Sequence, residues 1–226
     1  MKRALIIAAH PDDDILGCGA TMSRFQSQTE FRVVFIAEGT SCRFSDTDCE
    51  DYGAELTKRN NSALDALHEL RVTQVFFNNL PCGKLDQVPQ IEINKIIEKH
   101  VKEFKPDTVF THWDGDSNID HRKVHDATVI ATRPSTLGSG VATVLCYEVL
   151  SSSEWGFKDS FSPNLFFSVT EKDIDNKCSA FRKYYTEGNP WPHPRNDSGI
   201  EVLSKFRGMQ SGNEFSEAFR ILRACK

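Results

Sequence analysis

Short apolar runs alternate with helix-like stretches along this chain, and this alternation constrains the fold more than any other feature. Three runs in the first half predict strands, at 3–9, 31–37 and 108–112. The stretches with apolar residues on one helical face span 15–25, 55–70, 91–104 and 121–132. Strands that are apolar on both faces and separated by helices are typical of parallel sheets covered on both sides. The pattern therefore predicts an α/β fold.

The remaining signals are shorter or less regular. Further strands are predicted at 74–77, 143–149 and 164–169, and further helices at 171–187 and 198–210. The stretch between these two helices is rich in Pro and Asn and carries Trp191, His193 and Arg195, so it is either a plain surface turn or a loop that lines a site. The 226 residues contain no repeat, low-complexity segment or linker. We therefore predict a single domain over 1–226.

Charge and cysteine usage exclude several classes of protein. Lys and Arg total 27 against 32 Asp and Glu, giving a net charge of −5, so we expect no nucleic-acid partner. No apolar run approaches the roughly 20 residues of a transmembrane helix, and we expect none. The seven cysteines are scattered without CxxC pairs, which favours reduced thiols and a cytoplasmic location.

Two polar loops concentrate the acidic and imidazole side chains. The first is HPDDD at 10–14, directly after the first predicted strand. The second is HWDGDSNIDH at 112–121, which begins at the end of the strand at 108–112. In open α/β sheets, ligands bind at the carboxyl ends of the strands, at the point where the strand order reverses. If these two strands are neighbours across that point, the two loops face each other.

The residue types in these loops favour a transition-metal site. Three successive carboxylates repel one another in a folded loop, and a bound cation relieves that repulsion. Imidazoles nearby favour a borderline transition metal over Mg²⁺ or Ca²⁺. We expect His10, Asp13 and His121 to bind Zn²⁺, because two histidines and one carboxylate with an open position form a hydrolytic zinc site. Asp12 would remain as a free carboxylate beside the ion and act as general base.

Structural explanations of the same residues stay open. The HPDDD loop also fits a cap for the helix at 15–25, whose N-terminus favours negative charge, and this role can coexist with metal binding. For the acidic side chains of the second loop, Asp114, Asp116 and Asp120, the alternative to a role in the site is simple solvation. His125 lies four residues after His121 without an HExxH motif, so we expect it to be solvated. Surface or hydrogen-bonded supporting roles are expected for His68, His100 and His112.

The two loops resemble the paired motifs of the LmbE/PIG-L-like zinc-dependent N-deacetylases. AHPDDD at 9–14 is similar to A-H-P-D-D-E, and DSNIDHR at 116–122 is similar to D-x-[NH]-x-D-H-R. Further similar stretches bring the resemblance to nearly the whole chain: 53–66 around Arg59, PHPR at 192–195 and EAFRILR at 217–223. The resemblance implies a Rossmann-like fold, an open, mostly parallel sheet with helices on both faces. It also implies removal of an acetyl group from a small-molecule amino sugar of the N-acetylglucosamine type.

Roles follow from the resemblance at matching positions. His10, Asp13 and His121 resemble the zinc ligands, and Asp12 resembles the general base. Asp120 resembles the carboxylate beside the third ligand, which tunes the acid side of the site.

Two positions depart from the motifs. Asp14 replaces the usual Glu, and Asn118 stands where several members carry a His that supports the oxyanion or acts as acid. Asn can donate a hydrogen bond to an oxyanion but cannot deliver a proton. Either Asp12 acts twice, or His193 protonates the leaving amine.

Substrate contacts are expected from three basic side chains. Arg59, His193 and Arg195 would contact sugar hydroxyls or an attached anionic group, although an Arg within a helix is more often solvated or ion-paired.

Two other functions compete with the deacetylase. An amidase could use the same metal site on another N-acyl substrate or a thiol conjugate. A non-catalytic Rossmann-like protein could bind sugar or nucleotide, but no GxGxxG follows the first strand. The oligomeric state stays open, with a homo-oligomer as one alternative.

Overall fold

A seven-stranded sheet forms the centre of the molecule in the computed structural model, which describes residues 1–45, 49–134, 140–157 and 159–225. Its strands are β1 (Arg3–Ala8), β2 (Glu30–Ala37), β3 (Gln74–Leu80), β4 (Thr108–His112), β5 (Thr143–Tyr147), β6 (Leu165–Val169) and β7 (Phe215–Ala224). They lie in the order β3-β2-β1-β4-β5-β7-β6. The pairs among β1 to β5 are parallel, and β7 is antiparallel to both of its neighbours. The predicted open, mostly parallel α/β sheet is confirmed.

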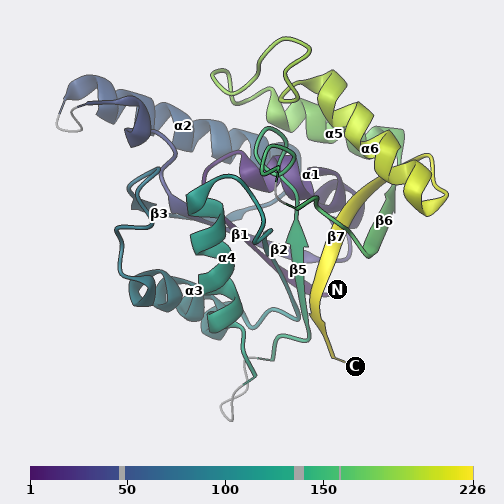
Figure 1. The fold of residues 1–226 in the computed structure, drawn as a ribbon, viewed down its shortest axis with the longest axis horizontal. Coiled ribbons are helices and arrows are strands. Elements are labelled where there is room, and N and C mark those ends of the chain that lie inside the picture. The colour runs from purple at the N-terminus through teal and green to yellow at the C-terminus, as the bar shows by residue number, and fades with distance from the viewer. Residues whose placement is uncertain (46–48, 135–139, 158, 226) are drawn as a thin grey trace.

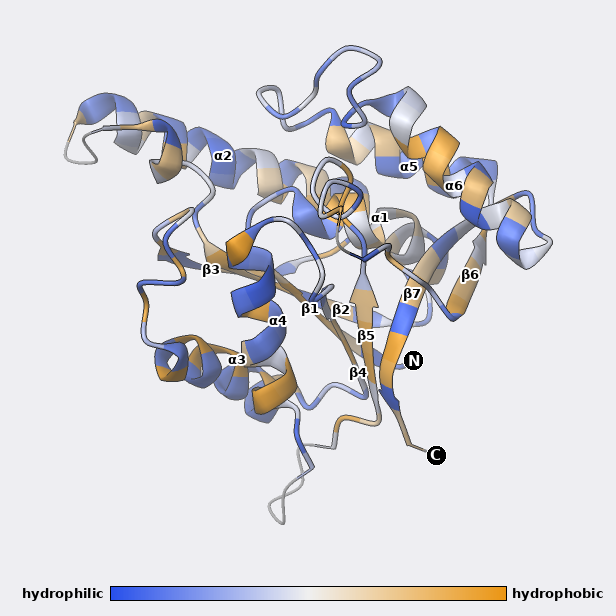
Figure 2. Cartoon of the chain, viewed as in Figure 1, coloured by the Kyte–Doolittle hydropathy of each residue, from blue (hydrophilic) through white to orange (hydrophobic). Residues whose placement is uncertain are grey.

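Helices cover both faces of this sheet (Figure 1). They are α1 (Asp13–Phe25), α2 (Glu50–Glu69), α3 (Gln90–Phe104), α4 (Ile119–Ala131), α5 (Glu171–Phe181) and α6 (Asp197–Ser211). One buried apolar layer joins α1, α2, α5 and α6 to the sheet, and a second joins α3 and α4 to the opposite face. Figure 2 shows that the strands are mostly hydrophobic, whereas the helices carry both hydrophobic and hydrophilic residues. This distribution explains why apolar runs in the sequence locate the central strands.

The order of the strands reverses between β1 and β4. The chain continues from β1 to β2 and β3 on one side, then returns to place β4 on the other side of β1. Ala4 of β1 is therefore in register with both Phe31 of β2 and Thr108 of β4. The loops that follow β1 and β4 leave the sheet at the same edge, as the sequence predicted.

The C-terminal part differs most from the prediction. The helix expected at 171–187 ends at Phe181, and the chain continues as turns toward the loop before α6. Strand β7 was not predicted, because Glu217 interrupts its apolar residues. The structure buries Glu217 in an ion pair with Lys177 of α5, whose Nζ lies 2.6 Å from its Oε1. A charge supplied by a distant helix thus allows a carboxylate inside the sheet.

Helix α1 approaches the sheet closely at Gly17. A Cβ at this position would lie 2.2 Å from the ring of Tyr147 on β5. The Tyr147 hydroxyl donates a hydrogen bond to the backbone oxygen of Ile7 at 2.8 Å. The small residue therefore lets α1, β1 and β5 pack together directly beneath the first polar loop.

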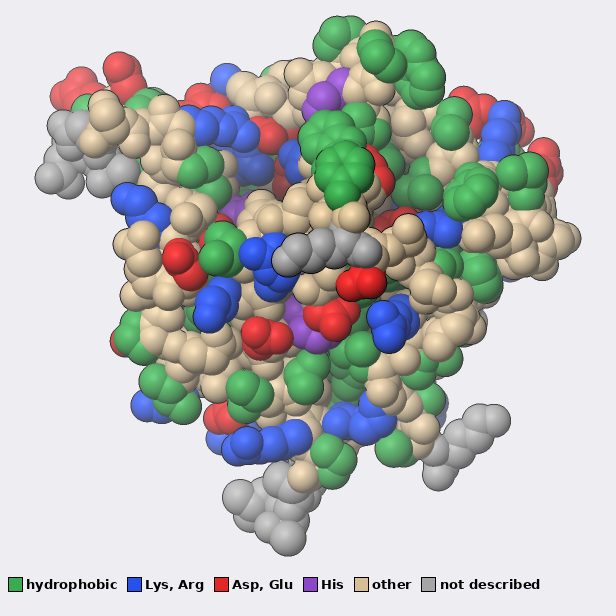
Figure 3. Space-filling view, viewed as in Figure 1, with side chains coloured by type: hydrophobic (Ala, Val, Ile, Leu, Met, Phe, Trp, Pro, Cys, Tyr) green, Lys and Arg blue, Asp and Glu red, His purple; other side chains and the backbone are tan. Residues whose placement is uncertain are grey.

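The surface mixes charges of both signs. On the face drawn in Figure 3, Lys and Arg side chains are interspersed with Asp and Glu. This face therefore presents no extended area of a single charge. Within the described residues, none of the helices combines the length and the apolar character that a membrane span requires.

Candidate metal and catalytic site

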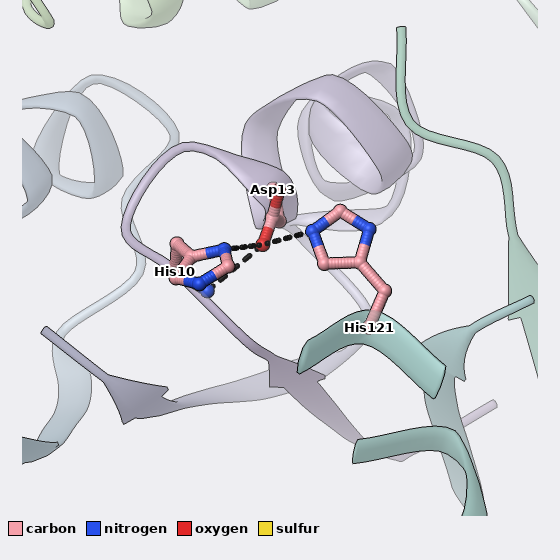
Figure 4. Close-up of side chains that lie close together, drawn as sticks. All are labelled: His10, Asp13 and His121. Atoms are coloured by element: carbon pink, nitrogen blue, oxygen red, sulfur yellow. Dashed lines mark hydrogen bonds and ion pairs between the residues drawn. The ribbon is translucent and has the colours of Figure 1, made fainter. Parts of the chain in front are cut away.

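The three predicted metal ligands converge at the edge of the sheet (Figure 4). His10 follows β1, Asp13 begins α1, and His121 lies in the first turn of α4. The Asp13 Oδ2 atom lies 3.4 Å from His10 Nδ1 and 3.4 Å from His121 Nε2. The His10 backbone N–H also donates to this oxygen at 2.8 Å. One carboxylate oxygen thus lies between two ring nitrogens that come from opposite sides of the switch point.

The donor set fits a divalent ion. The ligand atoms of His10, Asp13 and His121 lie within 4.8 Å of one another, and all three residues are buried. Asp13 Oδ1 and His121 Nε2 are buried polar atoms without a hydrogen-bond partner among the described residues. Buried polar atoms without partners are costly unless a ligand satisfies them. Two imidazole nitrogens and one carboxylate match the ligands of a hydrolytic zinc site.

A second carboxylate stands behind each imidazole. Asp120 Oδ2 lies 2.9 Å from His10 Nε2, and Asp116 Oδ1 lies 3.1 Å from His121 Nδ1. Each ring therefore donates its outer N–H to a carboxylate and turns its other nitrogen toward Asp13. This arrangement fixes the tautomer and orientation of metal-ligating histidines.

Asp116 and Asp120 are held in place by other hydrogen bonds. Ser152 and Ser153 donate to Asp116 Oδ2 at 2.9 and 2.7 Å, and the backbone N–H of Leu85 donates to Asp120 Oδ1 at 3.0 Å. Asp116 is 2% exposed and Asp120 is fully buried, so a solvated role is wrong for both. Asp114, in the same loop, is exposed.

The carboxylates reverse the effect of burial on the two imidazoles. Burial alone would lower the pKa of His10, but hydrogen bonds to Asp120 and Asp13 outweigh it and raise this pKa to about 9. Burial alone would also lower the pKa of His121. Asp13 and Asp116 outweigh this effect and raise the pKa of His121 to about 10. The three acidic groups therefore demand positive charge at this point, which protons or a divalent cation can supply.

His112 supports the site from inside the sheet edge. Its ring stacks on His121 with the centroids 3.9 Å apart, and its Nε2 accepts a hydrogen bond from the Ala9 N–H at 2.8 Å. Burial and the neighbouring His121 lower the pKa of His112 well below its usual value. His112 therefore has a hydrogen-bonded supporting place rather than a surface one.

His125 was predicted to be solvated, and this prediction is wrong. The side chain is buried, with 7% exposure, and its Nδ1 lies 2.9 Å from the backbone oxygen of His112. The spacing of four residues from His121 puts it on the inner side of α4. His100 is also buried, whereas His68 is exposed.

Asp12 has a strained backbone and two basic neighbours. Its φ of 129° lies in a region that L-residues rarely adopt, and such strain clusters at functional sites. Arg195 Nη1 lies 2.9 Å and Arg59 Nη2 lies 3.4 Å from Asp12 Oδ2. Burial outweighs the two guanidinium groups and raises the pKa of Asp12 to about 6. Asp12 occupies the N-cap position of α1, but its side chain makes no capping hydrogen bond.

Asp14, the residue that departs from the first motif, is fully buried at the start of α1. Its Oδ1 accepts a hydrogen bond from the Asp12 N–H at 3.3 Å. Burial and the charge of Asp12 raise the pKa of Asp14 to about 8. Asp14 therefore supports the backbone at Asp12 rather than pointing into the ligand set.

Glu187 completes the surroundings of Asp12, and no sequence pattern pointed to it. It forms ion pairs with Arg59, with Arg43 at 2.7 Å and with Arg195 at 3.5 Å. Arg59 also donates to the Pro11 backbone oxygen at 2.7 Å. The sequence placed Glu187 at the end of a helix, so no local signal pointed to these partners.

The other predicted site residues lie around the same centre. Asn118 is the N-cap of α4, and its side-chain oxygen accepts a hydrogen bond from the Asp120 N–H at 2.9 Å. His193 Nδ1 accepts from the Arg195 N–H at 3.1 Å, and its ring contacts Trp155 with the centroids 5.7 Å apart. The PHPR stretch therefore reaches Asp12 through Arg195.

The chain is similar in sequence to known deacetylases. The family model PIG-L, described as GlcNAc-PI de-N-acetylase, matches residues 5–132, which contain both polar loops. A curated relative, the "uncharacterized deacetylase YaiS" of Escherichia coli K12, is 30% identical over 192 residues, which cover 81% of this chain and 90% of the relative.

Solved structures share the fold at lower identity. The N,N'-diacetylchitobiose deacetylase of Pyrococcus horikoshii has a TM-score of 0.78 and 21% identity over 98% of this chain and 84% of its own. A zinc-inhibited form of teicoplanin deacetylase Orf2 has a TM-score of 0.72 and 17% identity over 99% of each chain. GalB of Pseudomonas putida KT2440, a 4-carboxy-2-hydroxymuconate hydratase, has a TM-score of 0.74 and 19% identity over 98% of this chain and 96% of its own. The same fold thus carries more than one chemistry.

Proposed function

Because the chain belongs to the PIG-L family of deacetylases, we propose that it is a zinc-dependent hydrolase that removes the acetyl group from an N-acetylglucosamine-type sugar or its conjugate. The convergence of His10, Asp13 and His121 on one point carries this proposal. A carboxylate behind each histidine supports it, because metal-ligating imidazoles are normally oriented in this way.

The ion would be held by His10 Nδ1 and His121 Nε2, which now face Asp13 Oδ2, together with the Asp13 carboxylate. When bound, zinc supplies Lewis acidity toward an acyl oxygen and lowers the pKa of water. Asp116 and Asp120 keep the two rings in the tautomer that leaves a lone pair for the ion. The protein's own contribution is therefore a preoriented pair of imidazoles beside one carboxylate, and the rings release protons when the ion binds.

Asp12 acts as the general base. Its pKa of about 6 is close to neutrality, which suits a group that must both take and return a proton. Asp12 accepts the proton of the attacking water as the new C–O bond forms, and then delivers it to the leaving nitrogen as the C–N bond breaks. The products are acetate and a free amine. Asn118 cannot deliver a proton, which favours Asp12 acting in both steps.

The basic side chains divide between positioning and substrate contact. Arg59 is only 6% exposed and contacts Asp12, Pro11 and Glu187, so we assign it to positioning the base. Arg195 is 17% exposed, and we assign it with His193 to contacts with sugar hydroxyls or an attached anion. Asn118 has its side-chain oxygen engaged in the cap of α4, which leaves its amide group as the donor for an oxyanion.

Acetate release tests this function. Purified protein is stripped of metal with a chelator, reloaded with Zn²⁺, and assayed for acetate and free amine with acetamido sugars, other N-acyl amides and thiol conjugates. We expect equal amounts of acetate and amine from the acetamido sugars, with activity lost on chelation and restored by Zn²⁺. Cleavage confined to the other amides would support the amidase instead.

Two further outcomes would overturn the deacetylase. Native mass spectrometry that finds a bound nucleotide and no metal would indicate a binding protein. Addition of water to a substrate double bond, without acetate release, would indicate a hydratase of the kind that shares this fold. We further propose a cytoplasmic location, which the scattered cysteines without CxxC pairs support.

A further inference from the structure

Two cysteine thiols meet beside the candidate metal site, and neither takes part in the proposed reaction. Cys42 lies in a short 3-10 helix (Ser41–Arg43) after β2, and Cys82 follows β3. The Cys82 thiol donates a hydrogen bond to Cys42 Sγ at 3.1 Å. Cys42 is exposed, whereas Cys82 is buried with 7% exposure. An oxidant from solvent therefore reaches Cys42 first.

The fold holds this pair together through Glu38. The Glu38 carboxylate accepts hydrogen bonds from the backbone N–H groups of Ser41 and Cys82, each at 2.9 Å. Gly83 has a φ of +71°, and a Cβ at this position would lie 3.4 Å from Cys42 Cβ. The loops after β2 and β3 are thus fastened to one carboxylate, with the two sulfurs between them.

We propose that Cys42 and Cys82 form a reversible disulfide when the protein meets hydrogen peroxide. Peroxide oxidises the Cys42 thiol to a sulfenic acid and is itself reduced to water. The Cys82 sulfur then attacks the Cys42 sulfur, so that the S–S bond forms, the S–O bond breaks and a second water leaves. An added dithiol returns both cysteines to thiols by exchange.

Little movement separates the thiol pair from the disulfide. Disulfide sulfurs lie about 2.05 Å apart, so the two atoms must approach by about 1 Å. The Cys82 N–H donates to both Glu38 and Ser41 Oγ, which holds Cys82 in place, so exposed Cys42 makes most of the movement.

The disulfide connects to the metal site through the backbone next to Cys82. The Gly83 N–H donates to Asp120 Oδ2 at 2.6 Å, and this carboxylate stands behind His10. A bond that joins positions 40 residues apart would stabilise both loops and leave this contact intact. It also prevents further oxidation of the Cys82 sulfur, which lies within 4.8 Å of the ligand atoms of His10 and Asp120.

Mass spectrometry and thermal unfolding test the proposal on the full chain. Reduced protein is treated with one equivalent of hydrogen peroxide, and remaining thiols are alkylated before digestion. We expect a loss of about 2 Da in the intact mass and a cross-linked peptide that contains Cys42 and Cys82. The melting temperature should rise by about 5–10 °C, and dithiothreitol should reverse every change.

Two variants complete the test. Cys42→Ser should lose both the cross-link and the rise in melting temperature, whereas Cys225→Ser, at another exposed cysteine, should behave as the parent protein. Oxygen atoms added to Cys42 without a cross-link would overturn the proposal. So would a disulfide to any other cysteine, or a rise in melting temperature that persists in Cys42→Ser. These readouts do not depend on deacetylase activity, so the two proposals fail independently.

Discussion

Removing the charge of Asp116 tests the site through a residue that does not itself face the ion. Asp116→Asn keeps the size of the side chain and one oxygen for Ser152 and Ser153. It removes the negative charge that lies 3.1 Å from His121 Nδ1. The Asp116 and His121 side chains are each only 1% exposed, so water cannot replace the lost partner.

The expected loss is in zinc affinity. Removing the carboxylate behind a metal-ligating histidine weakens metal binding by roughly 10- to 100-fold. Because the pair is almost fully buried, we expect the upper end, a dissociation constant about 100-fold higher, or about 2.8 kcal/mol. Burial opposes ionisation of Asp116, yet the contact with His121 and other hydrogen bonds outweigh it and lower its pKa to about 2. Asp116 is thus charged at neutral pH, as this expectation requires.

Competition with a chromophoric zinc chelator measures the dissociation constant at neutral pH. Asp114→Asn is the matched control, because Asp114 lies in the same loop, is exposed, and loses the same charge. Solvent and salt screen an exposed charge, so we expect its effect to stay within about twofold. Equal zinc affinities in the two folded variants would refute the assignment of Asp116 behind a metal ligand.

Three further changes probe the base and the fold. Asp12→Asn should lower turnover by roughly 10²- to 10⁴-fold while zinc content, measured by metal analysis, stays unchanged. Arg195→Gln removes a guanidinium that lowers the pKa of Asp12, so this pKa should rise above about 6. The base must be deprotonated to act, so the acid limb of the kcat/KM profile should move to higher pH by roughly one unit or more. An acid limb that stays in place would contradict the contact between Arg195 and Asp12. Lys177→Ala leaves Glu217 buried without its partner and should cost about 3–5 kcal/mol in urea unfolding, whereas Lys205→Ala, in an exposed pair, should change little.

The central part of the fold could be predicted because the buried strands are recognisable from their own apolar residues. Strand β1 is apolar on both faces, and β4 carries Val109 and Phe110 on opposite faces, a pattern typical of strands inside a parallel sheet. Strand β7 could not be predicted in this way. The burial of Glu217 depends on Lys177, 40 residues earlier, and on backbone N–H groups of α1. A strand that depends on distant partners has no local signature.

In the candidate site too, residues with a local sequence signal could be predicted, and residues that depend on distant partners could not. His10 and Asp13 are three residues apart in one loop, so their convergence could be predicted from spacing and from the resemblance of both loops to one family. Glu187 could not be predicted, because its partner Arg59 is 128 residues away. Asp116 opens the second motif, but its burial behind His121 depends on hydrogen bonds from Ser152 and Ser153, which lie 36 and 37 residues further along the chain.

The turn between Asp116 and Asp120 aims both imidazoles at once. Asp116 accepts a hydrogen bond from the Asn118 N–H, and Asn118 accepts one from the Asp120 N–H, each at 2.9 Å. The two hydrogen bonds therefore hold the Asp116 and Asp120 carboxylates at a fixed separation. Ile119 is exposed and can vary in chemistry without disturbing it, whereas the Ser117 hydroxyl donates to the backbone oxygen of Ser152 at 2.8 Å and helps to hold the turn. The length of this turn cannot vary, because a single inserted residue would rotate one carboxylate away from its ring and leave one of the two histidine ligands without its orienting partner.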